Sequence, residues 1–400
     1  MKKENDDFLN SIFALLTNLD TPRLRDLLIK KCKELGISQR KLSEIIGLER
    51  KSIQRIIEDE AQKIDIVTFL KISHFLKIDV QSLMQIYVSK ITLESIREIE
   101  KTKKASYILH TFDLDILKKE GFIKNKYDFD GIENRIVKYF KISSLYEYNN
   151  FTQAAYFSRI QRDYSNKMLN FWISLIYHQI SKINNPNIYN KELLITILPK
   201  LRGLTRDEKS GLQRVVRSLY EAGVTIILQS YVKKTQIRGA TFINHGKPFI
   251  VLTNYNNRYD SLWFSIAHEL YHVLKDFEQI EKLNYHLTGE SDLFIDDLAE
   301  EHANEFARDL FFSKPKMKYI KDFIDIPEYV DDYAKENNVH KSIIYGFYLF
   351  ENKEENIKYR KFLHKSEEAV KNMLITPWDK KDIEEITESI NKIFDKIKHN

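Results

Sequence analysis

The sequence has few of the residues that interrupt helices. Average usage would give roughly 28 Gly and 20 Pro in a chain of this length, but its 400 residues include only 11 Gly and 7 Pro. This composition disfavours an all-β sandwich with many tight turns and favours helix. The single cysteine, Cys32, excludes an intramolecular disulfide and every cysteine-rich zinc or iron–sulfur site.

Long apolar runs are also missing. No stretch reaches the roughly 18 uncharged apolar residues of a membrane span, and residues 1–20 lack the basic segment and cleavage site of a signal peptide. The apolar content of 43% is ample for several cores, and the chain length predicts two or three domains. We therefore expect a cytoplasmic protein with no membrane partner.

The net positive charge is concentrated in one segment. Residues 21–90 hold 14 Lys and Arg against 9 Asp and Glu, and this excess equals the net charge of +5 for the whole chain. A local basic surplus suggests binding to nucleic acid. An ordinary solvated helical surface is the alternative interpretation.

The same segment divides into five short amphipathic stretches. They are expected as helices at 24–35, between Ser38 and Gly47, and at 50–58, 65–76 and 80–87. Gly36 and Gly47 can take the left-handed conformation that often ends a helix, and Ser38 offers an N-cap oxygen. The sequence therefore predicts a five-helix bundle that contains a helix-turn-helix.

Residues 36–56 read GISQRKLSEIIGLERKSIQRI and resemble the Xre/Cro phage-repressor type of helix-turn-helix. The resemblance covers about residues 24–88 and implies that the third helix enters the major groove of an operator. Carried over by position, it assigns DNA contacts to Gln39, Arg50, Lys51, Ser52, Gln54 and Arg55, with Gln39 on a phosphate. Arg and Lys can read guanine, and Gln can read adenine.

The end of the third helix departs from this family. Glu58, Asp59 and Glu60 place negative charge near the expected DNA face. Palindromic operators would make a homodimer the default state. The alternative is a helical bundle that serves only for dimerisation or for binding a partner protein.

The middle of the chain carries no nucleotide-binding fingerprint. Residues 91–190 are charged and helical in pattern, with aromatic clusters that favour a core over a base-stacking platform, and we interpret them as a helical connector or docking region. Further on, residues 223–231, GATFIN and KPFIVLTNY are rich enough in β-branched and aromatic residues for three strands. His245 and Gly246 separate the last two strands as a hairpin turn would.

The helix that follows this small sheet contains an H-E-x-x-H motif. His268 and His272 are four residues apart, so both imidazoles lie on one helix face and can approach one cation, while Glu269 can reach a bound water. A catalytic zinc site needs a third protein ligand and an open position for water. Lys275 and Glu278 stand where an extended metzincin motif would have Gly and His, so the third ligand must come from further along the chain.

The next helix offers that ligand. Glu300, Ala303 and Ala307 lie at i, i+3 and i+7, a stripe of small residues that lets two helices approach with a carboxylate between them. Glu301 is turned away by about 100°. We therefore take Glu300 as the ligand, and Asp296, one turn earlier, as a candidate partner for an imidazole N–H.

The two motifs together look like the ImmA/IrrE metallopeptidase family, whose site is gluzincin-like. The resemblance extends from about residue 192 to residue 350, and an amino-terminal Xre module recurs in that family. It implies one Zn²⁺ per chain, held by His268, His272 and Glu300, with Glu269 as the general base. Tyr271 departs from the Gly usual in the family and leaves the shape of the substrate pocket open.

Several features of the predicted site stay undecided. Tyr271, Tyr285, His286 and His302 are all candidates to stabilise an oxyanion. An extended substrate is expected to add to a sheet edge at Pro248–Leu252. A structural metal, or a helix pair without metal, is the alternative to catalysis.

The sequence thus predicts a mainly α protein with a small β-sheet (α+β). The expected parts are an extension (1–20), an Xre-type helix-turn-helix bundle (21–90), the helical connector (91–190), a gluzincin-like zinc peptidase domain (191–365) and an amphipathic helical tail (366–400), the last for self-association. The leading hypothesis is a zinc endopeptidase that binds a double-stranded DNA operator and cleaves a repressor or antitoxin-like protein in a stress, phage or mobile-element response. The rivals are a non-proteolytic regulator whose metal site is vestigial or sensory, and an antitoxin.

Overall fold

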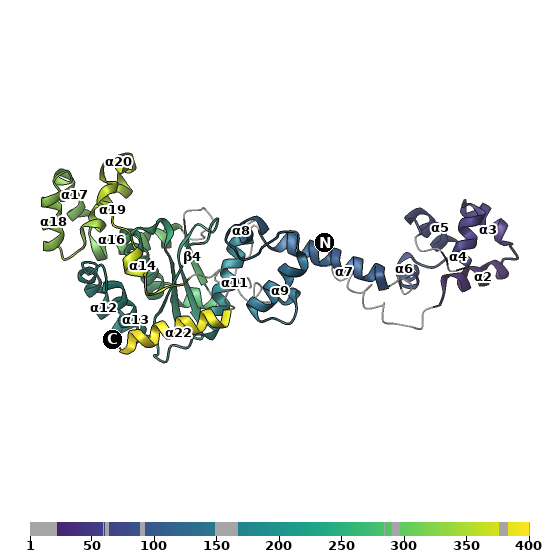
Figure 1. The fold of residues 1–400 in the computed structure, drawn as a ribbon, viewed down its shortest axis with the longest axis horizontal. Helices are drawn as coiled ribbons and strands as arrows, with labels where there is room; N and C mark the ends of the chain where they lie inside the picture. Colours follow the sequence, from purple (N-terminus) through teal and green to yellow (C-terminus); the bar gives the residue numbers. More distant parts are fainter. Residues whose placement is uncertain are drawn as a thin grey trace. The chain divides into compact units, whose positions relative to one another are not determined.

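The computed structural model describes residues 22–58, 60, 64–88, 93–148, 167–283, 285–289, 297–375 and 383–399 (Figure 1). Internal contacts divide the chain into two units, residues 1–106 and 107–400, which we describe separately. The described residues are mainly helical and include one mixed sheet, as the α+β prediction requires. None of the helices among them is long and apolar enough to cross a membrane.

The first unit contains the five short helices that the sequence predicts. They are α2 (Leu24–Glu34), α3 (Gln39–Ile46), α4 (Arg50–Ile57), α5 (Ile66–Leu76) and α6 (Val80–Val88), and α7 (Leu93–Thr111) follows. Gly36 and Gly47 have φ angles of 65° and 68° after α2 and α3, a conformation that side chains disfavour. The Ser38 hydroxyl accepts a hydrogen bond from the Lys41 amide and caps α3. The buried side chains of Leu28, Leu42, Ile72 and Leu83 join the helices in one core.

The second unit begins with helices that share the core of the sheet. They are α8 (Leu114–Lys119), α9 (Phe129–Phe140), η1 (Leu145–Glu147), α11 (Lys167–Lys182), α12 (Lys191–Leu204) and α13 (Gly211–Glu221). The ring of Trp172 on α11 lies 6.4 Å from the ring of Phe242 in the sheet. From residue 107 onward, the described part of the expected connector (91–190) therefore belongs to the second unit, because its buried side chains form one continuous core with those of the sheet.

The sheet has the strand order β4-β2-β3-β1-β5. Its strands are β1 (Thr225–Gln229), β2 (Ile237–Asn244), β3 (Lys247–Thr253), β4 (Tyr285–Gly289) and β5 (Leu374–Ile375). β2 is antiparallel to β3 and β4, and β1 is parallel to β3 and β5. His245 and Gly246 have φ angles of 50° and 71° between β2 and β3, which fits a two-residue hairpin turn with two positive φ angles. The predicted hairpin is confirmed.

The expectation that Pro248–Leu252 forms a sheet edge is wrong. These residues lie in β3, which pairs with β2 on one side and with β1 on the other. β1 precedes the hairpin in sequence but lies parallel to β3, on the side that the hairpin leaves open. Among the described strands, the edges are β4 and β5.

Helices cover both faces of the sheet. α14 (Tyr259–Lys275) packs on β2 and β3 and against α16 (Asp297–Phe311). Thr241 of β2 contacts α14, whereas its neighbour Phe242 contacts Trp172 of α11. Since successive residues of a strand point to opposite faces, α14 and α11 lie on opposite sides of the sheet.

The remaining helices of the second unit range from single turns to the 17 residues of α22. They are η2 (Tyr255–Asn257), α15 (Phe277–Leu283), α17 (Lys314–Ile320), η3 (Lys321–Phe323), α18 (Pro327–Glu336), α19 (Lys341–Glu351), η4 (Lys353–Glu355), α20 (Asn356–Tyr359), η5 (Arg360–Phe362), α21 (Glu367–Val370) and α22 (Ile383–His399).

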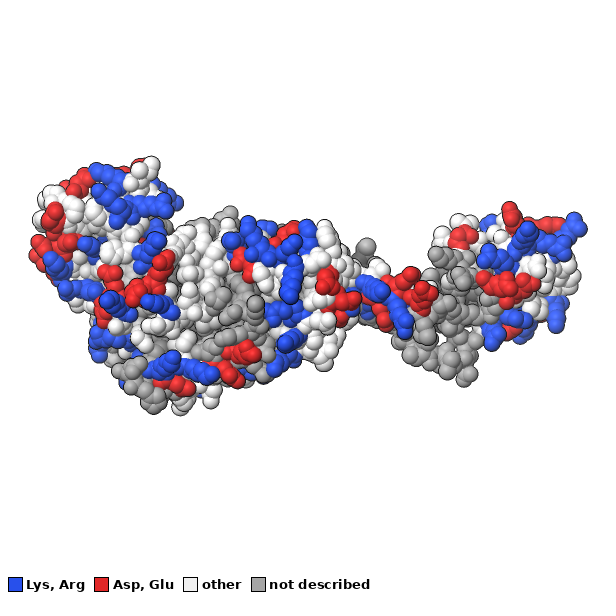
Figure 2. Space-filling model, viewed as in Figure 1, with Lys and Arg blue, Asp and Glu red and all other residues white. Residues whose placement is uncertain are grey.

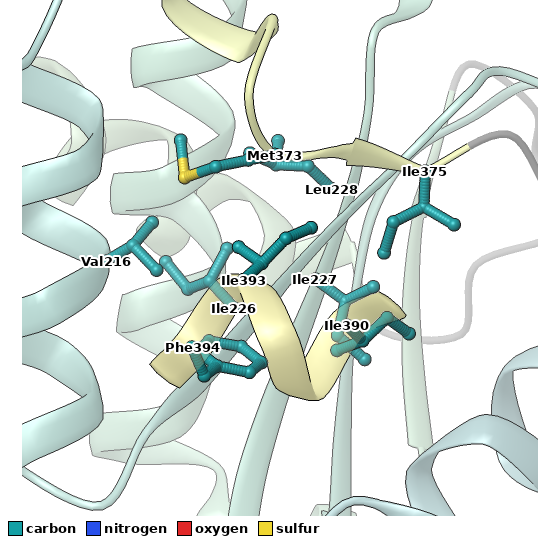
Figure 3. Close-up of a pocket in the computed structure, with 9 residues that line it drawn as sticks. All are labelled: Val216, Ile226, Ile227, Leu228, Met373, Ile375, Ile390, Ile393 and Phe394. Atoms are coloured by element: carbon teal, nitrogen blue, oxygen red, sulfur yellow. The ribbon is translucent and has the colours of Figure 1, made fainter. Parts of the chain in front are cut away.

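The carboxyl-terminal segment is part of the second unit and not a separate tail. β5 pairs with β1, and Ile390 and Phe394 of α22 are buried at 1% and 4% exposure. Figure 3 shows these two side chains, residues of β1 and Met373 around a small apolar cavity. The apolar face of α22 that suggested self-association is therefore covered by its own chain.

Candidate metal centre

α14 carries His268, Glu269 and His272 on buried positions. Apolar side chains surround most of this helix, which is typical of a helix packed on several sides, and the three polar residues are 1%, 0% and 0% exposed. The Nε2 atoms of the two histidines lie 3.1 Å apart. The i, i+4 spacing thus brings the two imidazoles together as the sequence indicates.

Glu300 reaches the same point from α16. Ala303 and Ala307 are fully buried on this helix, and their small side chains let α16 approach α14 closely. Oε2 of Glu300 lies 3.2 Å from Nε2 of His268, and Oε1 lies 3.5 Å from Nε2 of His272. The described structure therefore brings the three predicted ligands together.

The other ring nitrogens of the two histidines fix their tautomers. Nδ1 of His268 lies 3.1 Å from Oδ1 of Asn304, and Nδ1 of His272 lies 2.7 Å from Oδ2 of Asp276. Both partner oxygens are acceptors, so each Nδ1 carries a proton. When both rings are neutral, as ligands of a metal are, their Nε2 lone pairs point toward the carboxylate of Glu300, and this donor set suits zinc.

The pKa values of Glu300 and His272 also indicate that this cluster binds positive charge. Burial raises the pKa of Glu300, but hydrogen bonds from His268, His272 and His286 hold it far below its usual value. Burial lowers the pKa of His272, but hydrogen bonds to Asp276 and Glu300 raise it to about 9. The carboxylate is therefore ionised, and without a metal the cluster retains a proton.

The carboxylate of Glu269 is held against β2. Its Oε2 accepts a hydrogen bond of 2.7 Å from the Thr241 hydroxyl, while Oε1 is buried without a hydrogen-bond partner in the described structure. Gly239 lies beneath this carboxylate, and a Cβ there would overlap Oε1. One oxygen is thus anchored, and the other is buried beside Gly239 without a hydrogen-bond partner in the described structure.

Comparisons with known proteins found no match. No family model, no curated protein and no solved structure matches this chain.

The other candidate residues are not equally close to the centre. The ring of Tyr271 packs 5.7 Å from the ring of His272, at the border of the site. His286 contacts Glu300 directly. Tyr285 is buried on the opposite face of the sheet, beside Phe242, and His302 lies exposed on the outer side of α16. Tyr285 therefore projects from the face of the sheet opposite to the centre, and Asp296 lies outside the described residues.

Sequence reasoning missed three of the groups that support the centre. Asp276 stands one turn after His272, so its spacing alone could have identified it as an imidazole partner. Thr241 and Gly239 gave no such signal, because their contact with Glu269 depends on how β2 packs against α14.

A second group of two histidines and a glutamate lies near the start of α14. Nε2 of His340 and Nδ1 of His364 lie 3.1 and 3.2 Å from the carboxylate oxygens of Glu208. Nδ1 of His340, however, accepts a hydrogen bond from the Ser342 amide, so Nε2 carries the ring proton and donates it to Glu208. A ring in this tautomer has no lone pair for a metal at Nε2, and the group is better described as a hydrogen-bonded clamp.

In the first unit, the six residues expected to contact DNA are all exposed: Gln39, Arg50, Lys51, Ser52, Gln54 and Arg55. Gln39, Arg50 and Gln54 line one polar groove. Glu58 also lines this groove, and its carboxylate accepts a hydrogen bond of 2.8 Å from the side-chain amide of Gln54. Basic and acidic side chains are therefore mixed on this surface, as the sequence indicates, and Figure 2 shows both signs on the visible face of the first unit.

Proposed function

We propose that this chain is a zinc-dependent endopeptidase that carries its own DNA-binding unit. The observation that supports the proposal most is that donor atoms of His268, His272 and Glu300 lie within 4.8 Å of one another, with Glu269 beside them. Two imidazoles and one carboxylate leave the fourth position of a tetrahedral zinc site open, as in catalytic zinc sites. The resemblance to the ImmA/IrrE peptidases supports the same assignment.

In this proposal, bound zinc supplies a polarised substrate carbonyl and a water of lowered pKa. Glu269 accepts the proton of the attacking water and then delivers it to the leaving amine. The carboxylate suits this role because Thr241 anchors one oxygen and leaves the other without a partner. Its complete burial excludes bulk solvent from the proton transfer.

The substrate would lie along β4. This strand is an edge among the described strands, and it carries His286 beside Glu300. An extended peptide can add to such an edge through main-chain hydrogen bonds, and the scissile bond would then approach the metal centre. A peptide binding mode of this kind fits an unfolded or flexible segment of a protein substrate.

The first unit would bind a double-stranded DNA operator, with homodimers on palindromic sites. Its helix order and its exposed basic residues on α4 support this part of the proposal. A peptidase that binds its operator is suited to cleave a repressor or antitoxin-like protein at the same promoter. We therefore propose a regulator of a stress, phage or mobile-element response.

The test uses the purified full chain with zinc and the repressor encoded beside it. The wild type should contain one zinc per chain and cut the repressor, and Glu269→Gln should keep the zinc but abolish the cleavage. His268→Ala should lose both. Cleavage by Glu269→Gln would overturn the assigned base.

Two other results would favour the rivals. Zinc binding without cleavage of any neighbouring gene product would favour a regulator with a vestigial or sensory metal site. A tight complex with a neighbouring protein that binds their shared promoter, again without cleavage, would favour an antitoxin.

A further inference from the structure

Thr241 of β2 and His286 of β4 form one cross-strand pair on the face of the sheet that meets α14. The two residues are direct partners in the antiparallel register of β2 and β4. Directly opposed residues project from the same face of a sheet. Each one contacts a different carboxylate of the centre, Thr241 that of Glu269 and His286 that of Glu300.

The imidazole of His286 occupies one oxygen of Glu300. Its Nε2 lies 2.5 Å from Oε1, and its ring centroid lies 4.0 Å from that of His272. A carboxylate that binds a metal can only accept hydrogen bonds, so Nε2 of His286 is the donor in this contact. Oε2, 3.2 Å from Nε2 of His268, is then the oxygen that remains for the metal.

A carboxylate with two free oxygens can bind a cation through either oxygen or through both. A hydrogen bond to one oxygen selects the other, orients the ligand and raises metal affinity, as partners of metal ligands do. The side chain of His286 is 12% exposed and packs against the ring of His272. This packing holds the imidazole in position for its hydrogen bond to Glu300.

We propose that His286 is a positioning residue that holds Oε1 of Glu300 and leaves Oε2 to bind the metal through one oxygen. This inference rests on the proposed zinc site. The register of β4 against β2 is what sets the position of the imidazole. A shift of one residue would turn His286 to the other face of the sheet.

Zinc affinity of the full chain, measured by competition with a chromophoric chelator, tests this role. His286→Phe keeps a ring beside His272 but removes the donor, and we expect its affinity to fall about 10- to 100-fold. His286→Gln restores an N–H donor and should stay within about threefold of the wild type on the same scale. Leu287→Val is the matched control, because Leu287 lies next to His286 in β4 but is buried on the opposite face of the sheet, so its replacement should leave zinc affinity unchanged.

Each result distinguishes the two proposals. A wild type without zinc affinity overturns the zinc site itself. If the wild type binds zinc and His286→Phe binds it equally well, only the positioning role is overturned. Equal losses in the Phe and Gln variants would overturn the positioning role in favour of direct metal ligation by His286. An equal loss in Leu287→Val would also overturn it, because general damage to β4 would then explain the effect.

Discussion

His272 and Asp276 form a hydrogen bond of 2.7 Å between Nδ1 and Oδ2, one turn apart at the end of α14. The carboxylate fixes the ring proton on Nδ1 and so directs Nε2 toward the metal centre. Replacement of Asp276 by Ala should lower zinc affinity about 10- to 100-fold, which is typical of the loss of such a partner. A competition titration with a chelator measures the change.

A suitable control is Glu278→Ala. Glu278 is exposed two residues after Asp276 and lies outside the cluster of ligands, so its removal changes the local charge equally but leaves the hydrogen bond intact. If both variants lost affinity to the same extent, long-range charge and not the orientation of His272 would explain the effect.

Gly239 and Glu269 provide a second test of the site. A Cβ at residue 239 would overlap Oε1 of Glu269, so Gly239→Ala should destabilise the second unit by about 1–3 kcal/mol, the usual cost of overpacking. All three tryptophans of the sequence follow residue 107, so urea unfolding monitored by tryptophan fluorescence reports on this unit alone.

A double-mutant cycle shows whether the carboxylate causes that cost. In a Glu269→Ala background the overlapping oxygen is missing, and Gly239→Ala should then cost much less free energy of unfolding. If the cost were the same in both backgrounds, it would arise from the backbone of β2 and not from contact with Glu269.

Local patterns in the sequence predicted most of the centre. The ligands on α14 follow from the i, i+4 rule, and Glu300 follows from the stripe of small residues on α16, because a helix places side chains by sequence spacing alone. The contacts that strand residues make with the centre do not follow from sequence spacing. Thr241 and His286 meet the centre only through the register of β2 and β4, and the sequence of one strand does not specify its partner.

Long-range packing also joins segments that the sequence alone presents as separate. The pairing of β1 with β5 joins residues more than 140 positions apart, and no pattern near Leu374 indicates it. The amphipathic helix α22 and the helices between 107 and 183 have apolar faces that fit either self-association or an internal core. Only the tertiary structure shows that the described residues of these helices share one core with the sheet.

The clamp of Glu208, His340 and His364 predicts a pH dependence of stability. Burial lowers the pKa of His340 below 6.5, and the charge of His364 lowers it further, against the opposing effect of Glu208. Below pH 6.5 the unfolded chain therefore binds a proton at this residue that the folded chain does not, so stability falls as the pH falls below that value. Stability stops falling from this cause once the pH is below the pKa of His340 in the folded chain.

His340→Asn isolates this contribution. Asn can still cap α19 by accepting from the Ser342 amide, but it does not titrate, so the variant should lose less stability than the wild type between pH 7 and pH 5. The range from pH 7 to pH 5 stays above the ordinary pKa of Glu208. Burial raises the pKa of Glu208, but hydrogen bonds and the charges of the two histidines lower it overall. His245→Asn, at an exposed hairpin position, should follow the wild-type curve.

The mixed charge on α4 leads to a prediction about DNA binding. Arg50 and Lys51 are exposed at the start of this helix, where the resemblance to phage repressors implies contacts with an operator. Their joint replacement by Ala should weaken binding to a mixed-sequence duplex and reduce the salt dependence of the affinity, by about one unit of slope for each lost phosphate contact. Fluorescence anisotropy at several salt concentrations measures both quantities.

Lys33 provides the control for this experiment. It is exposed at the end of α2, and Lys33→Ala removes one positive charge from the first unit without changing α4. Its salt slope should remain that of the wild type if α4 carries the contacts. Equal slopes for the wild type and the Arg50 and Lys51 variant would mean that α4 does not contact phosphates, and the five-helix bundle would then serve dimerisation or partner binding.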